Sequence, residues 1–160
     1  MLTVSFTGHR CDKIGGWNLP NPTYNYICQE IEKVLKELKP DKVISGMAAG
    51  VDQWGANIAY KLGIPFIAAI PHIGQESIWP KTSQDIYRKL LSRASEVVIV
   101  SEGGYAAWKM QARNQWMVDN SDKVIAIFKQ TETNGGTFNC VQYALSVKKD
   151  IYYINPKDAP

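Results

Sequence analysis

The amino-acid sequence predicts an α/β protein with a Rossmann-like, doubly wound fold: a mainly parallel sheet with helices on both faces. The first observation is that short apolar runs, typical of buried strands, alternate strictly with longer segments whose apolar residues recur at helical spacing. The second is that polar or glycine-rich turns follow four of the expected strands, where a parallel sheet binds its ligands. A chain of 160 residues is expected to form one domain, residues 1–160.

The first part of the chain supplies two strands, each followed by a helix. Leu2–Phe6 alternates apolar and polar residues, which predicts a strand. Thr23–Leu38 has apolar residues at helical spacing and is expected to be a helix. Lys42–Ile44 is a short buried strand, and the helix after it is expected to run to about Leu62 because Gly63 follows as a C-terminal cap.

The middle of the chain is expected to add a buried strand, a capped helix and another buried strand. Pro65–Ile70 is almost wholly apolar, as in a strand covered on both faces. Thr82 or Ser83 is expected to cap the next helix. The inner face of this helix is expected to consist of Ile86, Leu90 and Leu91. Val97–Val100 then predicts a fourth buried strand.

The last third of the chain continues the same alternation. Apolar residues such as Met110 and Trp116 predict a helix, and Val124–Phe128 predicts a fifth strand. A helix through Val141 and a final strand, Ile151–Ile154, complete the expected fold.

Charge and cysteine content narrow the class of protein. The net charge is +3, with no basic run longer than Lys148–Lys149, which permits an anionic ligand and argues against nucleic acid as a partner. The 3 cysteines have no metal-ligand spacing and suit a reducing cytosol, and neither a metal nor a cofactor is expected. No apolar run is long enough to span a bilayer. We therefore expect a cytoplasmic protein without membrane contact, and we leave open whether it forms homo-oligomers.

The segment Ser45–Asp52 joins a strand to a helix through small residues. Such a turn brings backbone N–H groups and the positive end of the helix dipole to one point, which suits a phosphate or another anion. Alternatively, Gly46 and Gly50 only allow a tight turn and close packing of the helix on the strand. The turns after three other strands are expected at the same sheet edge, and this favours a binding site.

Four motifs occur in a fixed order along the chain, and together they resemble a known superfamily. They are Thr7–Arg10, Ser45–Asp52, Arg113–Met117 and Gly135–Thr137. In this order they resemble the SLOG superfamily, which joins the Smf/DprA DNA-processing proteins with the LOG (lonely guy) phosphoribohydrolases, and within it the small YpsA-like branch. The resemblance covers nearly the whole chain. It implies a Rossmann-like fold associated with nucleotides and nucleotide-derived ligands.

The same resemblance implies roles for single residues and shows where the chain departs from LOG enzymes. Gly8 and Arg10 would lie beside the phosphate or base of the ligand. Arg113 matches the arginine of the LOG arginine–lysine pair, but Asn114 replaces the lysine. Cys140 stands where the catalytic glutamate would follow the glycine turn, so LOG-type hydrolysis by the same residues is not expected. In that turn Asn134 also replaces the LOG proline.

Several residues allow two interpretations. Arg10 either makes a bidentate phosphate contact or is an ordinary surface arginine. His9 binds the ligand, donates a proton or only hydrogen-bonds to the neighbouring turn. Asp52 binds a ribose hydroxyl or is favoured by the helix dipole alone. Arg113 and Asn114 point about 100° apart on their helix, so one of them could face the site and the other water. The tryptophans on loops or at helix starts, which either stack on a base or pack the core, are Trp17, Trp79 and Trp108.

The sequence therefore predicts a domain that binds a nucleotide or nucleotide-derived small molecule, as a sensor or by sequestration. Hydrolysis of an N-glycosidic bond is the enzymatic version, and binding of single-stranded DNA in the manner of DprA is the alternative. The residues expected to bind the ligand are Thr7, Gly8, His9, Arg10, Gly46, Met47, Ala48, Ala49, Gly50, Asp52, Ser101, Gly103, Arg113, Asn114, Gly135, Gly136 and Thr137. The candidates for catalysis are Glu102, Asp52 and Arg113.

Overall fold

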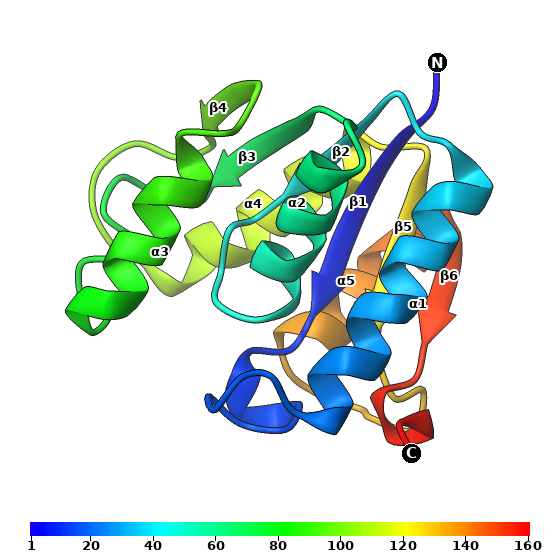
Figure 1. The fold of residues 1–160 in the computed structure, drawn as a ribbon. Helices are drawn as coiled ribbons and strands as arrows, with labels where there is room; N and C mark the ends of the chain where they lie inside the picture. Colours follow the sequence, from blue (N-terminus) through cyan, green and yellow to red (C-terminus); the bar gives the residue numbers. More distant parts are fainter.

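The computed structural model describes all 160 residues, and its six strands alternate with five α-helices (Figure 1). The strands are β1 (Thr3–Gly8), β2 (Lys42–Ser45), β3 (Phe66–Ile70), β4 (Glu96–Ile99), β5 (Lys123–Ile127) and β6 (Asp150–Ile154). The helices are α1 (Pro22–Leu38), α2 (Val51–Lys61), α3 (Lys81–Leu91), α4 (Ala107–Asp119) and α5 (Gly136–Ser146). Short 3-10 helices follow β1 and β6, at Cys11–Lys13 and Pro156–Asp158.

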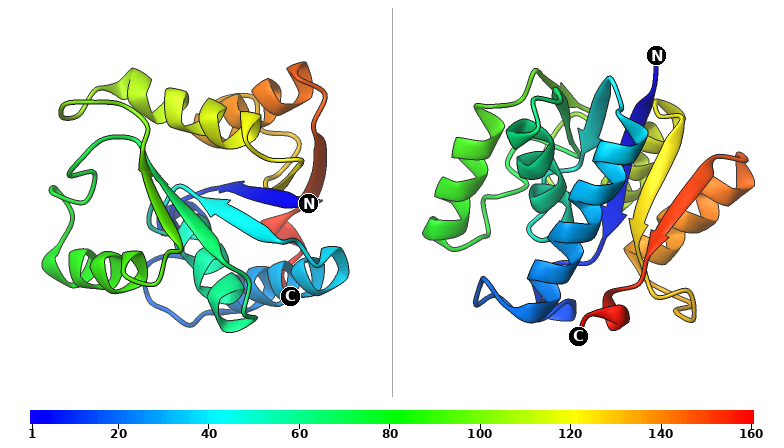
Figure 2. Two further views of the ribbon diagram at one scale, coloured as in Figure 1. Left: turned by 90° about the horizontal axis from the view of Figure 1, so that it is seen from above. Right: turned by 45° about the vertical axis from the view of Figure 1, so that its right-hand side comes forward.

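The strands form one sheet in the order β4-β3-β2-β1-β5-β6, and every neighbouring pair is parallel. Helices α1, α2 and α3 cover one face of the sheet, and α4 and α5 cover the other (Figure 2). The predicted Rossmann-like, doubly wound fold is therefore confirmed. The strand order reverses at β1, because the chain first builds the sheet to one side of β1 and later returns to place β5 on the other side. Ligands of such sheets bind at this switch point.

The polar residues of β1 are buried, although alternation usually indicates a strand with one face in water. Ser5 is only 1% exposed, and its hydroxyl lies 3.0 Å from the hydroxyl of Ser121, so the two satisfy each other. β1 is thus covered on both faces, as expected of a central strand in a parallel sheet.

The predicted end of the second helix is confirmed in detail. Gly63 follows α2 with a φ of 77°, a left-handed conformation that favours glycine. The amide of Ile64 donates to the carbonyl of Ala59 at 2.8 Å, and the amide of Gly63 donates to the carbonyl of Tyr60 at 3.1 Å. These two hydrogen bonds form a Schellman motif, which ends the helix.

The prediction for α3 was wrong in its cap and partly wrong in its inner face. Neither Thr82 nor Ser83 caps the helix, because it already begins at Lys81 and no side chain caps it. Tyr87 and Leu90 are its buried residues, whereas Ile86 is 60% exposed. The ring of Tyr87 packs edge-on against Trp79 at a centroid distance of 5.4 Å, an aromatic contact that helical spacing alone does not indicate.

The strand predicted at Val97–Val100 is present as β4, but the prediction that it is buried was wrong. β4 lies at the edge of the sheet with only β3 beside it, and Val97 and Ile99 remain 46% and 43% exposed. A run of β-branched residues indicates a strand, but it does not say whether that strand is central or at an edge. None of the helices is long and apolar enough to cross a membrane.

Candidate functional site

A polar cleft of about 330 Å³ opens at the carboxyl end of β1, at the switch point of the sheet. Four segments form it: the end of β1 with the residues that follow, the turn before α2 with the start of that helix, part of α4, and the start of α5. The predicted residues that line it are Thr7, Gly8, His9, Arg10, Ala48, Asp52, Arg113, Asn114, Gly136 and Thr137. Residues that sequence reasoning did not assign to the site also line it, namely Phe6, Asp12, Lys13 and Met110.

Two residues at the end of β1, Gly8 and Arg10, line this cleft in different ways. Gly8 lies so close to α2 that an added Cβ would be 2.7 Å from the side chain of Val51, so the glycine lets the strand and the helix pack together. Beyond it, Arg10 is exposed while it lines the cleft, which leaves its guanidinium available to a ligand.

Asp52 and Arg113 face each other across Gly46 at the floor of the cleft. A Cβ added at Gly46 would lie 2.5 Å from Nη1 of Arg113 and 2.8 Å from Oδ2 of Asp52. Burial raises the pKa of the Asp52 carboxyl, and the positive charge of Arg113 and a hydrogen bond from the amide of Ala48 oppose this shift. Burial likewise lowers the pKa of Arg113, and Asp52 opposes that change. Because residue 46 has no side chain, the oppositely charged Asp52 and Arg113 can both approach this loop.

Most of the N–H groups of Arg113 donate hydrogen bonds within the protein. Its Nη1 donates to the carbonyls of Gly46 at 2.6 Å and Ala69 at 3.2 Å, and its Nε donates to Oδ1 of Asn114 at 2.9 Å. Its Nη2 has no hydrogen-bond partner in the protein and is the donor left for a ligand. Both Arg113 and Asn114 line the cleft, although the sequence alone left open that one of them faces water.

The turn before α5 contains two glycines that are needed for different reasons. Gly135 has a φ of 99°, which favours glycine by conformation. Gly136 has no such φ, and a Cβ added there would meet nothing within 4 Å. It is the first residue of α5 and lines the cleft, so its missing side chain leaves open space in front of the first amides of the helix. Those amides have no partner inside the helix and favour an anion.

His9 makes a side-chain contact with Glu132 that sequence reasoning missed. Its Nε2 lies 2.9 Å from Oε2 and 3.1 Å from Oε1 of Glu132, which belongs to the loop between β5 and α5. The imidazole side chain is only 9% exposed. The two residues are 123 positions apart, and no local pattern in the sequence connects them. The pair joins the loops on the two sides of the switch point.

Other predicted residues are not brought into the cleft. Met47 is fully buried in the core, and Gly50 packs against the backbone of His9 and Arg10. For Gly46 and Gly50, the structure thus supports the alternative that these glycines allow close packing. The remaining predicted residues outside the cleft lining are Gly46, Ala49, Ser101, Glu102, Gly103 and Gly135. Ser101, Glu102 and Gly103 follow β4, which lies three strands away from β1.

None of the three tryptophans singled out in the sequence lines the cleft. Trp79 packs against Tyr87, and Trp108 lies over the ammonium group of Lys109 at 5.6 Å. Trp17 is 58% exposed and lines a different, larger groove. For the candidate site, packing is therefore the better interpretation of Trp79.

Cys140, which takes the place of the LOG glutamate, is a buried and unreactive thiol. It is 3% exposed and packs with Val118, Val124 and Ala144. Burial raises its pKa to about 11, against an opposing hydrogen bond with Thr7. A neutral thiol in an apolar cluster cannot replace a carboxylate in catalysis.

We expect the three cysteines to react slowly with Ellman's reagent at pH 8 in the native protein. Burial raises the pKa of Cys28 and of Cys140 to about 11, and it also raises that of Cys11. Because only the thiolate reacts, a rise of this size lowers the rate by about a hundredfold relative to an ordinary thiol. The urea-unfolded protein is the control and should react fully within minutes. Fast reaction of one native thiol would contradict the buried placement of that residue.

The fold and the cleft together define a class: a Rossmann-like α/β protein with a polar cleft at the switch point of its sheet. Residues 4–159 match the YspA SLOG family, and the chain belongs to this family. The chain is 31% identical over 146 residues to the uncharacterized SPbeta prophage-derived protein YoqJ of Bacillus subtilis, covering 79% of this chain and 84% of YoqJ. The resemblance inferred from the four motifs is thereby confirmed.

Two solved structures share the fold. DNA processing protein A (DprA) from Helicobacter pylori matches 95% of this chain with a TM-score of 0.68 and 21% identity. This chain spans 64% of that DprA chain, which is less than two thirds of its length. The molybdenum cofactor binding protein from Rippkaea orientalis matches 96% of this chain and 76% of its own, with a TM-score of 0.60 and 17% identity. At such identities the likeness shows the fold alone.

Proposed function

We propose that this protein binds a nucleotide or a nucleotide-derived small molecule in the cleft at the end of β1. The observation that carries the proposal is that three unused groups attractive to phosphate converge there. They are the exposed guanidinium of Arg10, the free Nη2 of Arg113 and the first amides of α5 behind Gly136. An arginine binds phosphate through paired N–H groups, and a helix N-terminus adds a positive dipole.

The dimensions of the cleft favour a small molecule over a nucleic-acid strand. Its volume of about 330 Å³ lies at the lower end of the range for small-molecule sites. A site for single-stranded DNA needs a basic track with aromatic side chains for successive bases, and no tryptophan lines this cleft. The H. pylori DprA structure is described by its single-stranded DNA binding mode, and the R. orientalis protein by molybdenum cofactor binding. Both descriptions support a ligand site on this fold and leave DNA as the alternative.

Hydrolysis of an N-glycosidic bond is the enzymatic version of this proposal, and the cleft favours Asp52 as its carboxylate. Asp52 lines the cleft beside Arg113, whereas Glu102 is exposed and outside the cleft lining. In this reaction water adds to the anomeric carbon as the bond to the base breaks, and the base leaves with a proton. Chromatography of nucleoside monophosphates after incubation with the protein tests it. Release of free base that persists in the Asp52→Asn variant would remove Asp52 from that role.

Replacing Arg10 with alanine should weaken nucleotide binding by about 1.5–3 kcal/mol, the range for a hydrogen bond to a charged group, while leaving the fold unchanged. Calorimetric titration with adenosine and guanosine mono-, di- and triphosphates and with NAD measures this. Arg88→Ala is the matched control, because Arg88 is an exposed arginine on α3 that does not line the cleft. It should bind like the parent protein.

Two outcomes would contradict the proposed function. Equal affinity of the Arg10 and Arg88 variants would remove Arg10 from the site. A parent protein that binds none of these nucleotides, but binds a labelled single-stranded oligonucleotide below micromolar concentration with steep salt dependence, would favour the DNA-binding alternative.

A further inference from the structure

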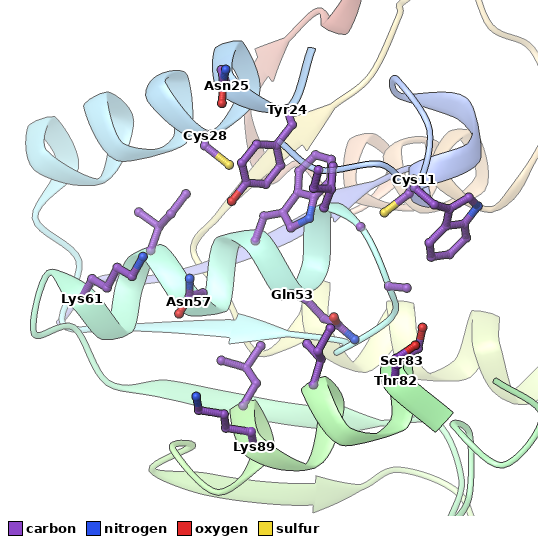
Figure 3. Close-up of a pocket in the computed structure, with 18 of the residues that line it drawn as sticks. Cys11, Tyr24, Asn25, Cys28, Gln53, Asn57, Lys61, Thr82, Ser83 and Lys89 are labelled. Atoms are coloured by element: carbon purple, nitrogen blue, oxygen red, sulfur yellow. The ribbon is translucent and has the colours of Figure 1, made fainter. Parts of the chain in front are cut away.

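A second cavity, of about 900 Å³, lies between α1, α2 and α3, and we call it the helical groove (Figure 3). It adjoins the candidate site but is lined by different residues. Arg10 and Ala48 line the cleft, whereas their chain neighbours Cys11 and Ala49 line the helical groove. The proposed function makes no use of this groove.

The lining of the helical groove is built from regularly spaced residues of three helices. On α2 it includes Gln53, Trp54, Asn57, Ile58 and Lys61, which fall on one helical face. α1 and α3 provide the walls on either side, as the close-up shows (Figure 3). Because α2 has 11 residues, its floor is about 16 Å long. The groove is therefore elongated.

Apolar side chains occupy the length of the groove. Trp54 and Leu90 are 7% and 5% exposed, whereas Ile86 is 60% exposed on the α3 wall. Cys28 adds a neutral thiol, because burial raises its pKa to about 11 against the opposing charge of Lys61. The exposed Ile86 beside the largely buried Trp54 and Leu90 is an apolar surface without a partner in the protein.

Positive charge gathers at one end of the groove. Lys61 of α2 and Lys89 of α3 lie at one end, and Cys11, Thr82 and Ser83 lie at the other (Figure 3). Arg93 follows Lys89 by four residues along the chain and also lines the groove. None of these three cations forms an ion pair in the protein, although Arg93 stacks on the ring of Tyr60 at 4.9 Å.

The acidic residue of the groove does not neutralise this end. Glu32 lines the groove but pairs with Lys36 on its own helix at 3.6 Å. Three unpaired cations therefore lie at one end of a groove in which apolar side chains such as Trp54 and Ile58 alternate with polar ones such as Gln53 and Asn57. The complementary ligand has an apolar body and a negative charge at one end.

We propose that the helical groove binds an elongated amphiphile with a single terminal anionic group, such as a fatty carboxylate or an alkyl phosphate. The apolar chain lies along α2 between α1 and α3, and the anionic group meets Lys61, Lys89 and Arg93. The volume lies within the range for small-molecule sites. The binding energy comes mainly from burial of the chain, and the cations select the charged end.

Calorimetric titration with decanoate, decyl phosphate and uncharged decanol tests the proposal at concentrations below micelle formation. Both anions should bind at one site per chain, and decanol should bind about tenfold more weakly, the ratio expected when one charge-assisted contact is lost. The Lys89→Glu/Arg93→Glu variant should lose this preference. Ile86→Asp, an exposed position that cannot disturb the core, should weaken all three ligands.

Matched variants separate this site from the nucleotide site. Lys148→Glu/Lys149→Glu reverses two positive charges outside the groove and should bind decanoate like the parent protein. Arg10→Ala should also leave decanoate binding unchanged, so failure of the nucleotide proposal does not affect this test. Co-sedimentation with phosphatidylglycerol vesicles distinguishes a free amphiphile from a lipid surface. The proposal would be overturned if the protein bound vesicles but not decanoate. It would also be overturned if both groove variants bound decanoate as tightly as the parent protein.

Discussion

The Arg113→Met variant should be less stable than the parent protein by about 3–5 kcal/mol, the usual cost of leaving a buried charge uncompensated. The substitution leaves the Asp52 carboxylate without its main opposing charge, and the carbonyl of Ala69 loses the donor that Arg113 supplies. For a chain of this length the melting temperature should fall by about 10 °C. Urea denaturation followed by circular dichroism measures the change in unfolding free energy.

The loss of stability in this variant should depend on pH. Burial already raises the pKa of Asp52 above its unfolded value, and removal of Arg113 raises it further. A carboxyl with a raised folded-state pKa stabilises the protein when protonated and loses that contribution as the pH rises through its folded pKa. The difference between variant and parent should therefore be larger at pH 8 than at pH 5.

Two further variants control this experiment. Arg88→Met removes an exposed arginine and should change stability by no more than about 0.5 kcal/mol. Adding Asp52→Asn to Arg113→Met should restore part of the loss, because the amide carries no charge to leave unpaired. If Arg113→Met were as stable as Arg88→Met, the guanidinium would not hold the floor of the cleft.

Gly50→Ala should cost about 3 kcal/mol or more of unfolding free energy, which chemical denaturation measures. Gly50 has a φ of 105°, and its new Cβ would lie 2.6 Å from the carbonyl oxygen of His9 and 2.9 Å from the Cα of Arg10. Left-handed strain and a clash with backbone atoms each cost on the order of 1–3 kcal/mol, and backbone cannot move aside as a side chain can.

Gly136→Ala is the matched glycine variant. It has open space around the new Cβ and an ordinary φ, so stability should stay unchanged or rise by up to about 1 kcal/mol. Equal destabilisation of the Gly50 and Gly136 variants would contradict the different reasons that the structure gives for these glycines.

The sequence was informative wherever a local pattern has one physical cause. A chain in which strands alternate with helices is expected to form a parallel sheet, because each helix connects two strands that run in the same direction. The glycine after α2 marks the end of that helix for a local reason, its left-handed conformation. The sequence contains no comparable signal for strand order. Val97–Val100 resembles a central strand because its residues are β-branched, yet it lies at the edge, since order depends on where each crossover helix returns.

Strand order also decides which of the predicted site residues meet in the cleft and which do not. Gly8 ends β1 and Gly136 begins the helix after β5, and because these strands are neighbours the two glycines meet in the cleft. Ser101 and Gly103 follow β4 and lie at the same edge but three strands away. Glu132 was missed because its partner His9 is distant in sequence, and a hydrogen bond between two such residues has no periodicity to detect.

The pairing of β1 with β5 also determines when the cleft can exist during folding. The backbone amide of Thr3 in β1 donates a hydrogen bond to Oδ2 of Asp122, which lies 119 residues later and just before β5 begins. A partly folded chain that has joined β1 only to β2, β3 and β4 has one side of its central strand unpaired and no α5 in place. Closing so long a loop is slow, because its entropy is lost before the new contacts compensate for it. The binding cleft is therefore expected to be among the last parts of the molecule to form, and the first to be lost if β5 detaches.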